Sequence, residues 1–176
     1  MSFTDVSASA YYADAVGWAY RYGIANGTGN NQFSPDQKCT RAEIITFLWR
    51  AYGSPEPTID NPFIDVTETD YYYKAVLWAR EKGLIRDFEM STNKFYPDFE
   101  CQRFRAMYYL YAAAGAPSVT AKRLFNDVDP STYYGGAVTW AVENGIANGT
   151  GDKTFSPTDI CTRAQIMTFI YRNLAK

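Results

Sequence analysis

Three arginines recur at equivalent places along the chain and are the strongest candidates for chemistry. Arg41, Arg103 and Arg163 each stand two residues after a cysteine. A guanidinium presents a rigid fork of N–H donors that matches a carboxylate. Each arginine also falls at the expected start of a helix, where backbone N–H groups and the helix dipole favour an anion. The alternative is an ordinary ion pair, for example with Asp5 or Glu43, because such pairs are common on protein surfaces.

Three tryptophans recur in the same way, as Trp18, Trp78 and Trp140. They stand among apolar neighbours on expected helices, which favours packing in the core. Stacking on the face of a sugar is the alternative for such amphipathic rings.

Several kinds of chemistry are excluded by composition. The chain of 176 residues has no histidine, which removes histidine-based catalytic triads and histidine metal ligands. Its three cysteines, Cys39, Cys101 and Cys161, cannot all pair within one chain and match no zinc motif, so we expect small buried hydrophobes. No residue pattern calls for a metal or a cofactor.

Charge and hydropathy exclude two further classes of partner. Seventeen basic and nineteen acidic residues give a net charge of -2 without a basic run, which argues against nucleic acid. No stretch is apolar enough to insert into a membrane. The start, Met1-Ser2-Phe3, lacks the basic and apolar regions of a signal peptide. The chain is therefore either cytosolic or an excised piece of a secreted protein, and the repeats described below favour the second.

Internal repetition dominates the sequence. Phe3-x-Asp5-Val6 returns at Phe63 and at Phe125, with offsets of 60 and then 62 residues. The two outer copies match with one constant shift of 122 residues, from Phe3 through Arg172. The repeated aspartates Asp5, Asp65 and Asp127 are expected to accept bonds from nearby backbone. We place the repeats at residues 1–57, 58–118 and 119–176, with breaks at proline- and glycine-containing linkers.

Each repeat is expected to fold as helix, loop, helix. The first helix should start at a hydroxyl cap and end at a left-handed glycine. These residues are Ser9, Thr69 and Ser131 for the caps, and Gly23, Gly83 and Gly145 for the ends. Thr40-x-x-Glu43 and Thr162-x-x-Gln165 predict capping boxes for two of the second helices. The second helices of all three repeats are apolar nearly all round, which predicts that they are buried together in a central three-helix bundle.

Taken in order, these recurrent sequence motifs resemble the surface-layer homology repeat. That family shows an F-x-D-V start, an aromatic pair, a G-I-x-x-G turn, an F-x-P turn and a T-R-A-E helix start. The first repeat carries these as Phe3, Tyr12, Gly23, Phe33 and Thr40-Arg41-Ala42-Glu43. The resemblance covers almost the whole chain, three times over.

The resemblance implies an all-α pseudo-threefold spindle around a central three-helix bundle, and a non-catalytic anchor on the bacterial cell surface. Its partner would be the peptidoglycan-linked secondary cell wall polysaccharide, often through a pyruvylated amino sugar, bound in grooves between repeats. The candidate glycan-binding residues are Arg41, Arg103, Arg163, Gly27, Gly149, Glu43, Gln165, Trp18 and Trp140. The arginine would meet the acidic sugar, and the loop glycines would let the backbone come close to it. By position these roles fall on Arg41 with Gly27 and on Arg163 with Gly149.

The middle repeat departs from its neighbours at the motif itself. Phe104 and Arg105 replace alanine and glutamate, and residues 86–89 replace the Asn-Gly-Thr-Gly loop of the outer repeats. We therefore expect two competent grooves at most, with the third blocked by Phe104 or built differently.

Two other functions stay open on the residues alone. A glycosidase would use one asymmetric pair of carboxylates, whereas the carboxylates here recur with the repeat. A protein-interaction or self-assembly module, including self-association of the chain, would suit a tyrosine-rich surface.

Overall fold

A computed structural model describes residues 3–86 and 92–175 of the chain. Within this part the protein is all-α, as predicted, and its β-structure is limited to isolated bridges. The six helices are α1 (Ala13–Arg21), α2 (Arg41–Ala51), α3 (Tyr73–Glu81), α4 (Arg103–Ala113), α5 (Gly135–Glu143) and α6 (Arg163–Leu174). None of them is long and apolar enough to cross a membrane.

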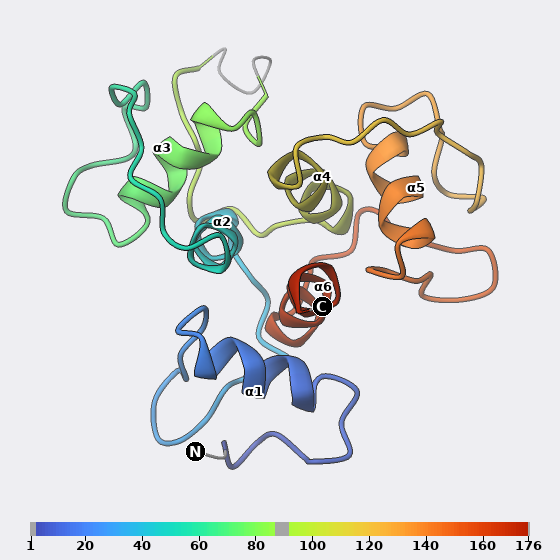
Figure 1. The fold of residues 1–176 in the computed structure, drawn as a ribbon, viewed down its shortest axis with the longest axis horizontal. Coiled ribbons are helices and arrows are strands. Elements are labelled where there is room, and N and C mark those ends of the chain that lie inside the picture. Colours follow the sequence, from blue (N-terminus) through green and yellow to red (C-terminus); the bar gives the residue numbers. More distant parts are fainter. Residues whose placement is uncertain (1–2, 87–91, 176) are drawn as a thin grey trace.

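The second helix of each repeat lies at the centre of the molecule and the first helix lies outside. Figure 1 shows α2, α4 and α6 grouped in the middle, with α1, α3 and α5 around them. Helix α2 packs against both α4 and α6. Each outer helix packs on the central helix of the preceding repeat, α3 on α2 and α5 on α4, while α1 closes on α6. The repeats therefore interlock, and the two ends of the chain meet in one helix pair.

A ring of backbone hydrogen bonds joins the three repeats just before the central helices. The Cys39 N–H donates to the Cys161 carbonyl (2.9 Å), Cys101 to Cys39 (2.9 Å) and Cys161 to Cys101 (3.0 Å). All three cysteines are unpaired thiols with no exposed surface, which confirms the expectation of buried hydrophobes. Burial raises the pKa of Cys161 to about 12, so its thiol stays protonated and unreactive at neutral pH.

Local capping explains where the central helices begin. The Thr40 side chain accepts from the Glu43 N–H while Glu43 accepts from the Thr40 N–H, and Thr162 and Gln165 do the same. These two capping boxes confirm the prediction. Gln102, at the start of α4, makes no side-chain cap, as expected for the divergent repeat.

The outer helices confirm one expectation and correct another. Their glycine ends are left-handed, with φ of 68° at Gly23, 75° at Gly83 and 68° at Gly145. The hydroxyl caps were wrong, because these helices begin later, after Tyr12, Tyr72 and Tyr134, without any side-chain cap. A preceding turn satisfies the first helical N–H instead; for example, Ala13 donates to the Ala10 carbonyl at 3.0 Å.

Candidate functional site

Each recurrent arginine begins a central helix and reaches into the loop of the next repeat. Arg163 is 5% exposed, and its Nε donates to the Phe33 carbonyl (2.9 Å) while its Nη2 donates to the Asn26 carbonyl (2.8 Å). Its guanidinium carbon lies 4.6 Å from the centre of the Phe33 ring. The third repeat thus supplies the cation that holds the loop of the first.

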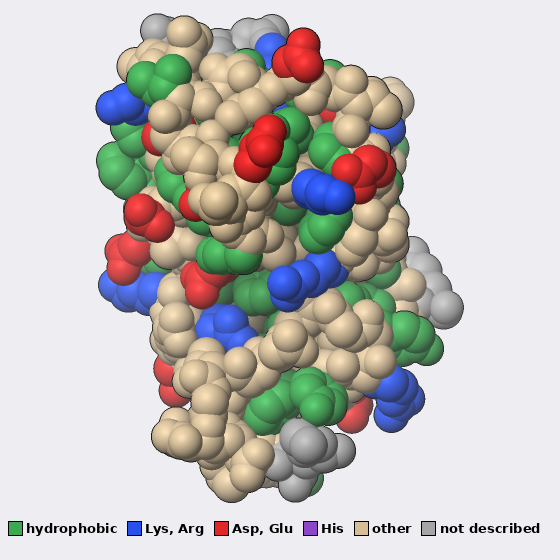
Figure 2. Space-filling model, turned by 90° about the vertical axis from the view of Figure 1, so that its left-hand side faces the viewer, with side chains coloured by type: hydrophobic (Ala, Val, Ile, Leu, Met, Phe, Trp, Pro, Cys, Tyr) green, Lys and Arg blue, Asp and Glu red, His purple; other side chains and the backbone are tan. Residues whose placement is uncertain are grey.

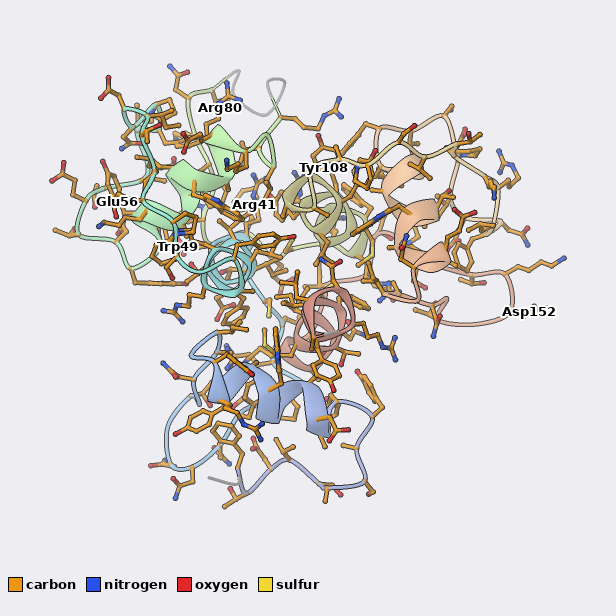
Figure 3. All side chains as sticks on the ribbon, viewed as in Figure 1. Arg41, Trp49, Glu56, Arg80, Tyr108 and Asp152 are labelled. Carbon is orange, nitrogen blue, oxygen red and sulfur yellow. The ribbon has the colours of Figure 1, made fainter. Side chains whose placement is uncertain are left out.

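Arg103 follows the same scheme, and Arg41 shares its ring contact. Arg103 donates to the carbonyls of Phe155 (3.0 Å) and Asn148 (2.9 Å) and lies 4.5 Å over the Phe155 ring. Arg41 lies over the Phe95 ring at 4.9 Å, close to the molecular centre in Figure 3. Gly27 therefore belongs with Arg163 and Gly149 with Arg103, instead of with the arginines of their own repeats.

The hydrogen-bond acceptors of Arg103 and Arg163 are main-chain carbonyls, and not the carboxylates that the sequence offered as alternative partners. A buried guanidinium stays charged at neutral pH, although burial lowers the pKa of both side chains. Their hydrogen bonds use Nε and Nη2, and Nη1 bonds no residue in the described part of the chain.

The helix starts themselves offer little to an anion, which corrects the expectation of free N–H groups. The N–H of Arg41 donates to the Phe99 carbonyl (2.8 Å), and the next N–H donates to the Pro97 carbonyl (3.1 Å). The third is held by the capping box. The first two N–H groups of α4 and of α6 likewise donate to loop carbonyls of the neighbouring repeat.

The repeated aspartates position the loops that the arginines hold. Asp5 accepts from the Phe33 N–H (2.8 Å) and from the Ser34 N–H (2.7 Å) through its two carboxylate oxygens. Ser34 has a φ of 56°, which is unfavourable for a residue with a side chain. Asp65 and Asp127 repeat the arrangement at the other two turns. The bonds are to backbone, as expected, but to a turn that lies 28 to 31 residues further along the chain.

Arg103 lies in the wall of a groove to which all three repeats contribute. The groove has a volume of about 310 Å³. Its lining comprises Tyr11, Arg103, Asn148, Gly149, Thr150, Gln165, Thr168, Phe169 and Arg172. Tyr11, at its edge, is 65% exposed. A second cation, an amide and an exposed aromatic ring therefore surround the Arg103 guanidinium.

The residues around Arg163 are the repeat equivalents of that set. Tyr71 is 61% exposed and stands where Tyr11 stands, with Arg50 in the place of Arg172. Burial raises the pKa of Tyr71, the Glu43 carboxylate adds to that rise, and the Arg50 guanidinium opposes it. The main chemical difference is that Glu43 replaces Gln165.

The third position, around Arg41, is built from different residues. Arg86 lies 4.4 Å over the Tyr133 ring and 5.4 Å over the Tyr108 ring, so its side chain lies among the aromatic residues there. Arg105 stands where the other grooves have Glu43 or Gln165. Blocking of the Arg103 groove by Phe104 was one of two alternatives from the sequence. The Phe104 ring packs on the Tyr134 ring at 4.7 Å and does not line that groove.

The two loop glycines are required by the loop itself. A Cβ on Gly27 would come within 2.5 Å of the Gln32 carbonyl oxygen and 2.8 Å of the Phe3 ring. A Cβ on Gly149 would come within 2.6 Å of the Thr154 carbonyl oxygen. Glycine at these positions lets the loop close under the groove, which is enough to explain it without a ligand.

No tryptophan lines the groove at Arg103. Trp78 is 2% exposed and Trp140 is 8% exposed, with Trp140 against the Tyr111 ring at 5.6 Å. Trp18 is half-buried on α1, beside Tyr171 at 5.7 Å. The exposed aromatic at the groove is Tyr11, which sequence reasoning missed, although the recurrent tyrosine pair was the available signal.

This arrangement can bind an anion beside a flat apolar face but offers no metal centre. Among the described residues, no group of three or more histidine, cysteine, aspartate or glutamate side chains could hold a metal ion. Figure 2 shows acidic and basic side chains interspersed over the face drawn, with no broad patch of one sign.

Comparison with known proteins places the repeats in a family. The sequence model of the S-layer homology domain matches residues 2–45 and 124–167, which together make up half of the chain. Both matched stretches begin in the outer repeats and end shortly after the arginine motif.

Similar proteins are found among surface proteins and enzymes of bacteria. A "Cell surface protein" of Thermoanaerobacter kivui is 32% identical over 118 residues, which are 64% of this chain and 15% of that protein. "Exoglucanase XynX" of Acetivibrio thermocellus is 26% identical over 157 residues, 87% of this chain and 14% of the enzyme. "Amylopullulanase" of Thermoanaerobacterium thermosulfurigenes is also 26% identical over 157 residues, 87% of this chain and 8% of that enzyme. The chain thus spans 15% or less of the length of these relatives.

Proposed function

Because the chain belongs to the S-layer homology domain family, we propose that it anchors a larger protein to the bacterial cell wall from the outside. The similarity to a cell surface protein supports this location. Two relatives bear the names of enzymes, and the chain covers only a small part of each. Any catalytic activity of the parent protein would reside outside these repeats, since the recurrent carboxylates here serve the turns and caps.

The ligand in this proposal is an acidic saccharide of the peptidoglycan-linked wall polysaccharide, such as a pyruvylated amino sugar. The observation that carries it is the composition of the groove at Arg103. A guanidinium with one nitrogen unused faces a second arginine, Arg172, and an exposed tyrosine, Tyr11. The cations suit a carboxylate, and the ring suits the apolar face of a sugar.

Two grooves are competent in this account, those at Arg103 and Arg163. The third lacks the glycine loop and holds Arg86 against its tyrosines, so Arg41 serves the fold. Each competent groove binds modestly, and two of them on one chain add avidity.

The wall-binding body in this proposal is a single pseudo-threefold unit built from the repeats at 1–57, 58–118 and 119–176. Its support is the interlocking of outer and central helices across these boundaries. A lone repeat would carry an outer helix without the central helix on which it packs.

Co-sedimentation with purified wall sacculi tests this function. The chain should pellet with intact sacculi and stay in solution after hydrofluoric acid has stripped the polysaccharide. Equal pelleting before and after the acid treatment would contradict the proposal and favour a protein or peptidoglycan partner. Release of reducing sugar from the sacculi would favour an enzyme.

A further inference from the structure

A pocket lies beside the Arg163 groove, in the loop of the first repeat that Arg163 holds. It has a volume of about 360 Å³. Asn26 and Gly27 border both sites, because the Asn26 carbonyl accepts from Arg163 at 2.8 Å and both residues line the pocket. Their repeat equivalents, Asn148 and Gly149, line the Arg103 groove. The remaining lining residues of the pocket are Phe3, Tyr20, Gly29, Asn30, Asn31 and Gln32.

A tight turn of the backbone forms one wall of this pocket. The Gln32 N–H donates to the Gly29 carbonyl at 2.8 Å. Asn30 and Asn31, at the tip of the turn, both have a left-handed backbone, with φ of 49° and 56°. Asparagine adopts this conformation more readily than most residues, which explains the two asparagines at the tip. The turn does not account for the amides of Asn26 and Gln32, which lie outside its tip.

The pocket combines four side-chain amides with two aromatic rings, and its lining has no charged residue. None of the four amides forms a side-chain hydrogen bond with another described residue. Each offers N–H donors and a carbonyl acceptor. The Tyr20 ring meets the Phe3 ring edge to face, with 5.3 Å between the ring centroids. The rings suit the apolar face of a sugar, and the amides suit its hydroxyl and acetamido groups.

The third repeat has different residues around the same loop. Val142 stands at the position of Tyr20, and Thr154 stands at the position of Gln32. The tip is charged there, and Figure 3 marks its Asp152 at the edge of the molecule. A single β-bridge closes the loop in both repeats. The loop therefore forms without a tyrosine and a glutamine, and the fold does not require them at these positions.

The chain before the repeated phenylalanine contacts residues outside the loop in the two repeats where the structure describes it. In each, the residue two places before the phenylalanine contacts the segment just after it. Asn61 donates to the Val66 carbonyl at 2.7 Å, and Arg123 pairs with Asp129 at 3.8 Å. These contacts direct the preceding chain toward the start of the outer helix and away from the loop.

We propose that this pocket binds a neutral, acetamido-bearing sugar unit, next to the acidic unit in the Arg163 groove. The apolar face of the sugar lies on Tyr20, and its acetamido and hydroxyl groups bond the amides of Asn26 and Gln32. The link to the groove rests on the proposed function, because it takes both units from one polysaccharide. Two joined units bind more tightly than either alone, since the second attaches within the same complex.

The side-chain amide signals of the native chain report on this pocket directly. In heteronuclear NMR spectra of the isotope-labelled chain, N-acetylglucosamine should shift the side-chain signals of Asn31 and Gln32 saturably. Glucuronate, an acidic sugar without an acetamido group, should leave them in place. The inference fails if N-acetylglucosamine gives no saturable shift below about 100 mM, which would correspond to negligible affinity. Equal shifts with glucuronate would also overturn it.

Exchanges between repeats supply the variants. Tyr20→Val/Gln32→Thr gives the first repeat the residues of the third, so the loop should stay folded. This variant should lose the saturable shift of Asn31. It should also bind purified wall polysaccharide about fivefold or more weakly, because a ring contact and an amide hydrogen bond are both lost. Tyr20→Phe keeps the ring and should bind like the native chain.

The pocket and the anchoring function fail separately in these measurements. Unchanged polysaccharide affinity in Tyr20→Val/Gln32→Thr overturns the pocket, while pelleting of the native chain with sacculi still supports anchoring. Saturable shifts with N-acetylglucosamine in a chain that does not pellet with sacculi support the pocket and contradict anchoring. Weak binding by Tyr20→Phe would also overturn the inference, because the hydroxyl and not the ring would then carry the effect.

Discussion

At the scale of single residues, Arg103 and Arg163 serve the fold and the groove at once. Each uses two nitrogens to hold main-chain carbonyls of the next repeat, and in the proposed function the third binds the ligand. A loss of wall binding in an alanine variant would therefore not separate contact with the ligand from damage to the loop.

Removing one of these arginines should cost stability as well as binding. Arg163→Ala leaves the carbonyls of Phe33 and Asn26 without their charged donor, and unsatisfied buried groups cost about 1–3 kcal/mol each. We expect the free energy of unfolding in urea to fall by about 2–5 kcal/mol. A change below about 1 kcal/mol would show that these hydrogen bonds contribute little to the fold.

The residue at the third helical position should set the difference between the two grooves. Glu43 places a carboxylate near Arg163, whereas Gln165 is neutral. Gln165→Glu should weaken binding of an acidic saccharide at the Arg103 groove by about three- to tenfold, and Glu43→Gln should strengthen the other groove, as expected for one nearby charge. Both exchanges keep a capping residue. Calorimetric titration with purified wall polysaccharide measures this, and equal affinities in all variants would refute the charge effect.

At the scale of elements, the aspartate-held turn supports each groove. The N–H bonds from Phe33 and Ser34 hold the pKa of Asp5 below its usual value, although burial alone would raise it. An aspartate with a lowered folded-state pKa stabilises the fold above its unfolded-state pKa of about 4, and that stability is lost as pH falls through the folded value.

Asp5→Asn tests the turn directly. The variant should unfold more easily at pH 7, by about 1–3 kcal/mol, because one of the two N–H bonds to the turn is lost or weakened. Between about pH 5 and pH 3 its stability should fall less steeply than that of the native chain. Parallel urea titrations at several pH values measure both effects. An unchanged pH slope would contradict the role of this carboxylate.

The ends of helices could be predicted from the sequence where the residues that form the cap are close to one another along the chain. The capping boxes span three residues, and the glycine ends follow from backbone geometry alone. The start of the outer helices was placed wrongly, because the turn before each tyrosine pair satisfies the first N–H without a hydroxyl. The bond from Asp5 to the Phe33 turn could not be placed, because tertiary contact brings together residues 28 positions apart.

At the scale of the whole molecule, the repeats and the all-α class follow from periodicity, but the assignment of arginines to grooves does not. Arg163 and Asn26 are 137 residues apart, and only the closure of α1 on α6 brings them together. A motif shared by three repeats does not reveal which repeat each arginine contacts. Sequence reasoning consequently grouped each arginine with the glycine of its own repeat.

Interlocking predicts that the chain unfolds as one unit. A chain without residues 1–39 loses α1 and the acceptors of Arg163, which exposes the apolar face of α6. We expect the full chain to show a single sharp urea transition by circular dichroism and the truncated chain to show a broad one or to aggregate. An equally steep transition in the truncated chain would contradict the interlocked arrangement.

The most direct measurement compares wall-polysaccharide affinity of the native chain with that of Tyr11→Ala/Tyr71→Ala. Both tyrosines are more than 60% exposed, so their removal should leave the unfolding midpoint unchanged. Ile64→Ala, at 70% exposure and absent from the lining of the Arg103 groove, is the matched control. The account predicts that the double variant binds about tenfold or more weakly while the control binds like the native chain. Native affinity in the double variant would contradict glycan binding in these two grooves.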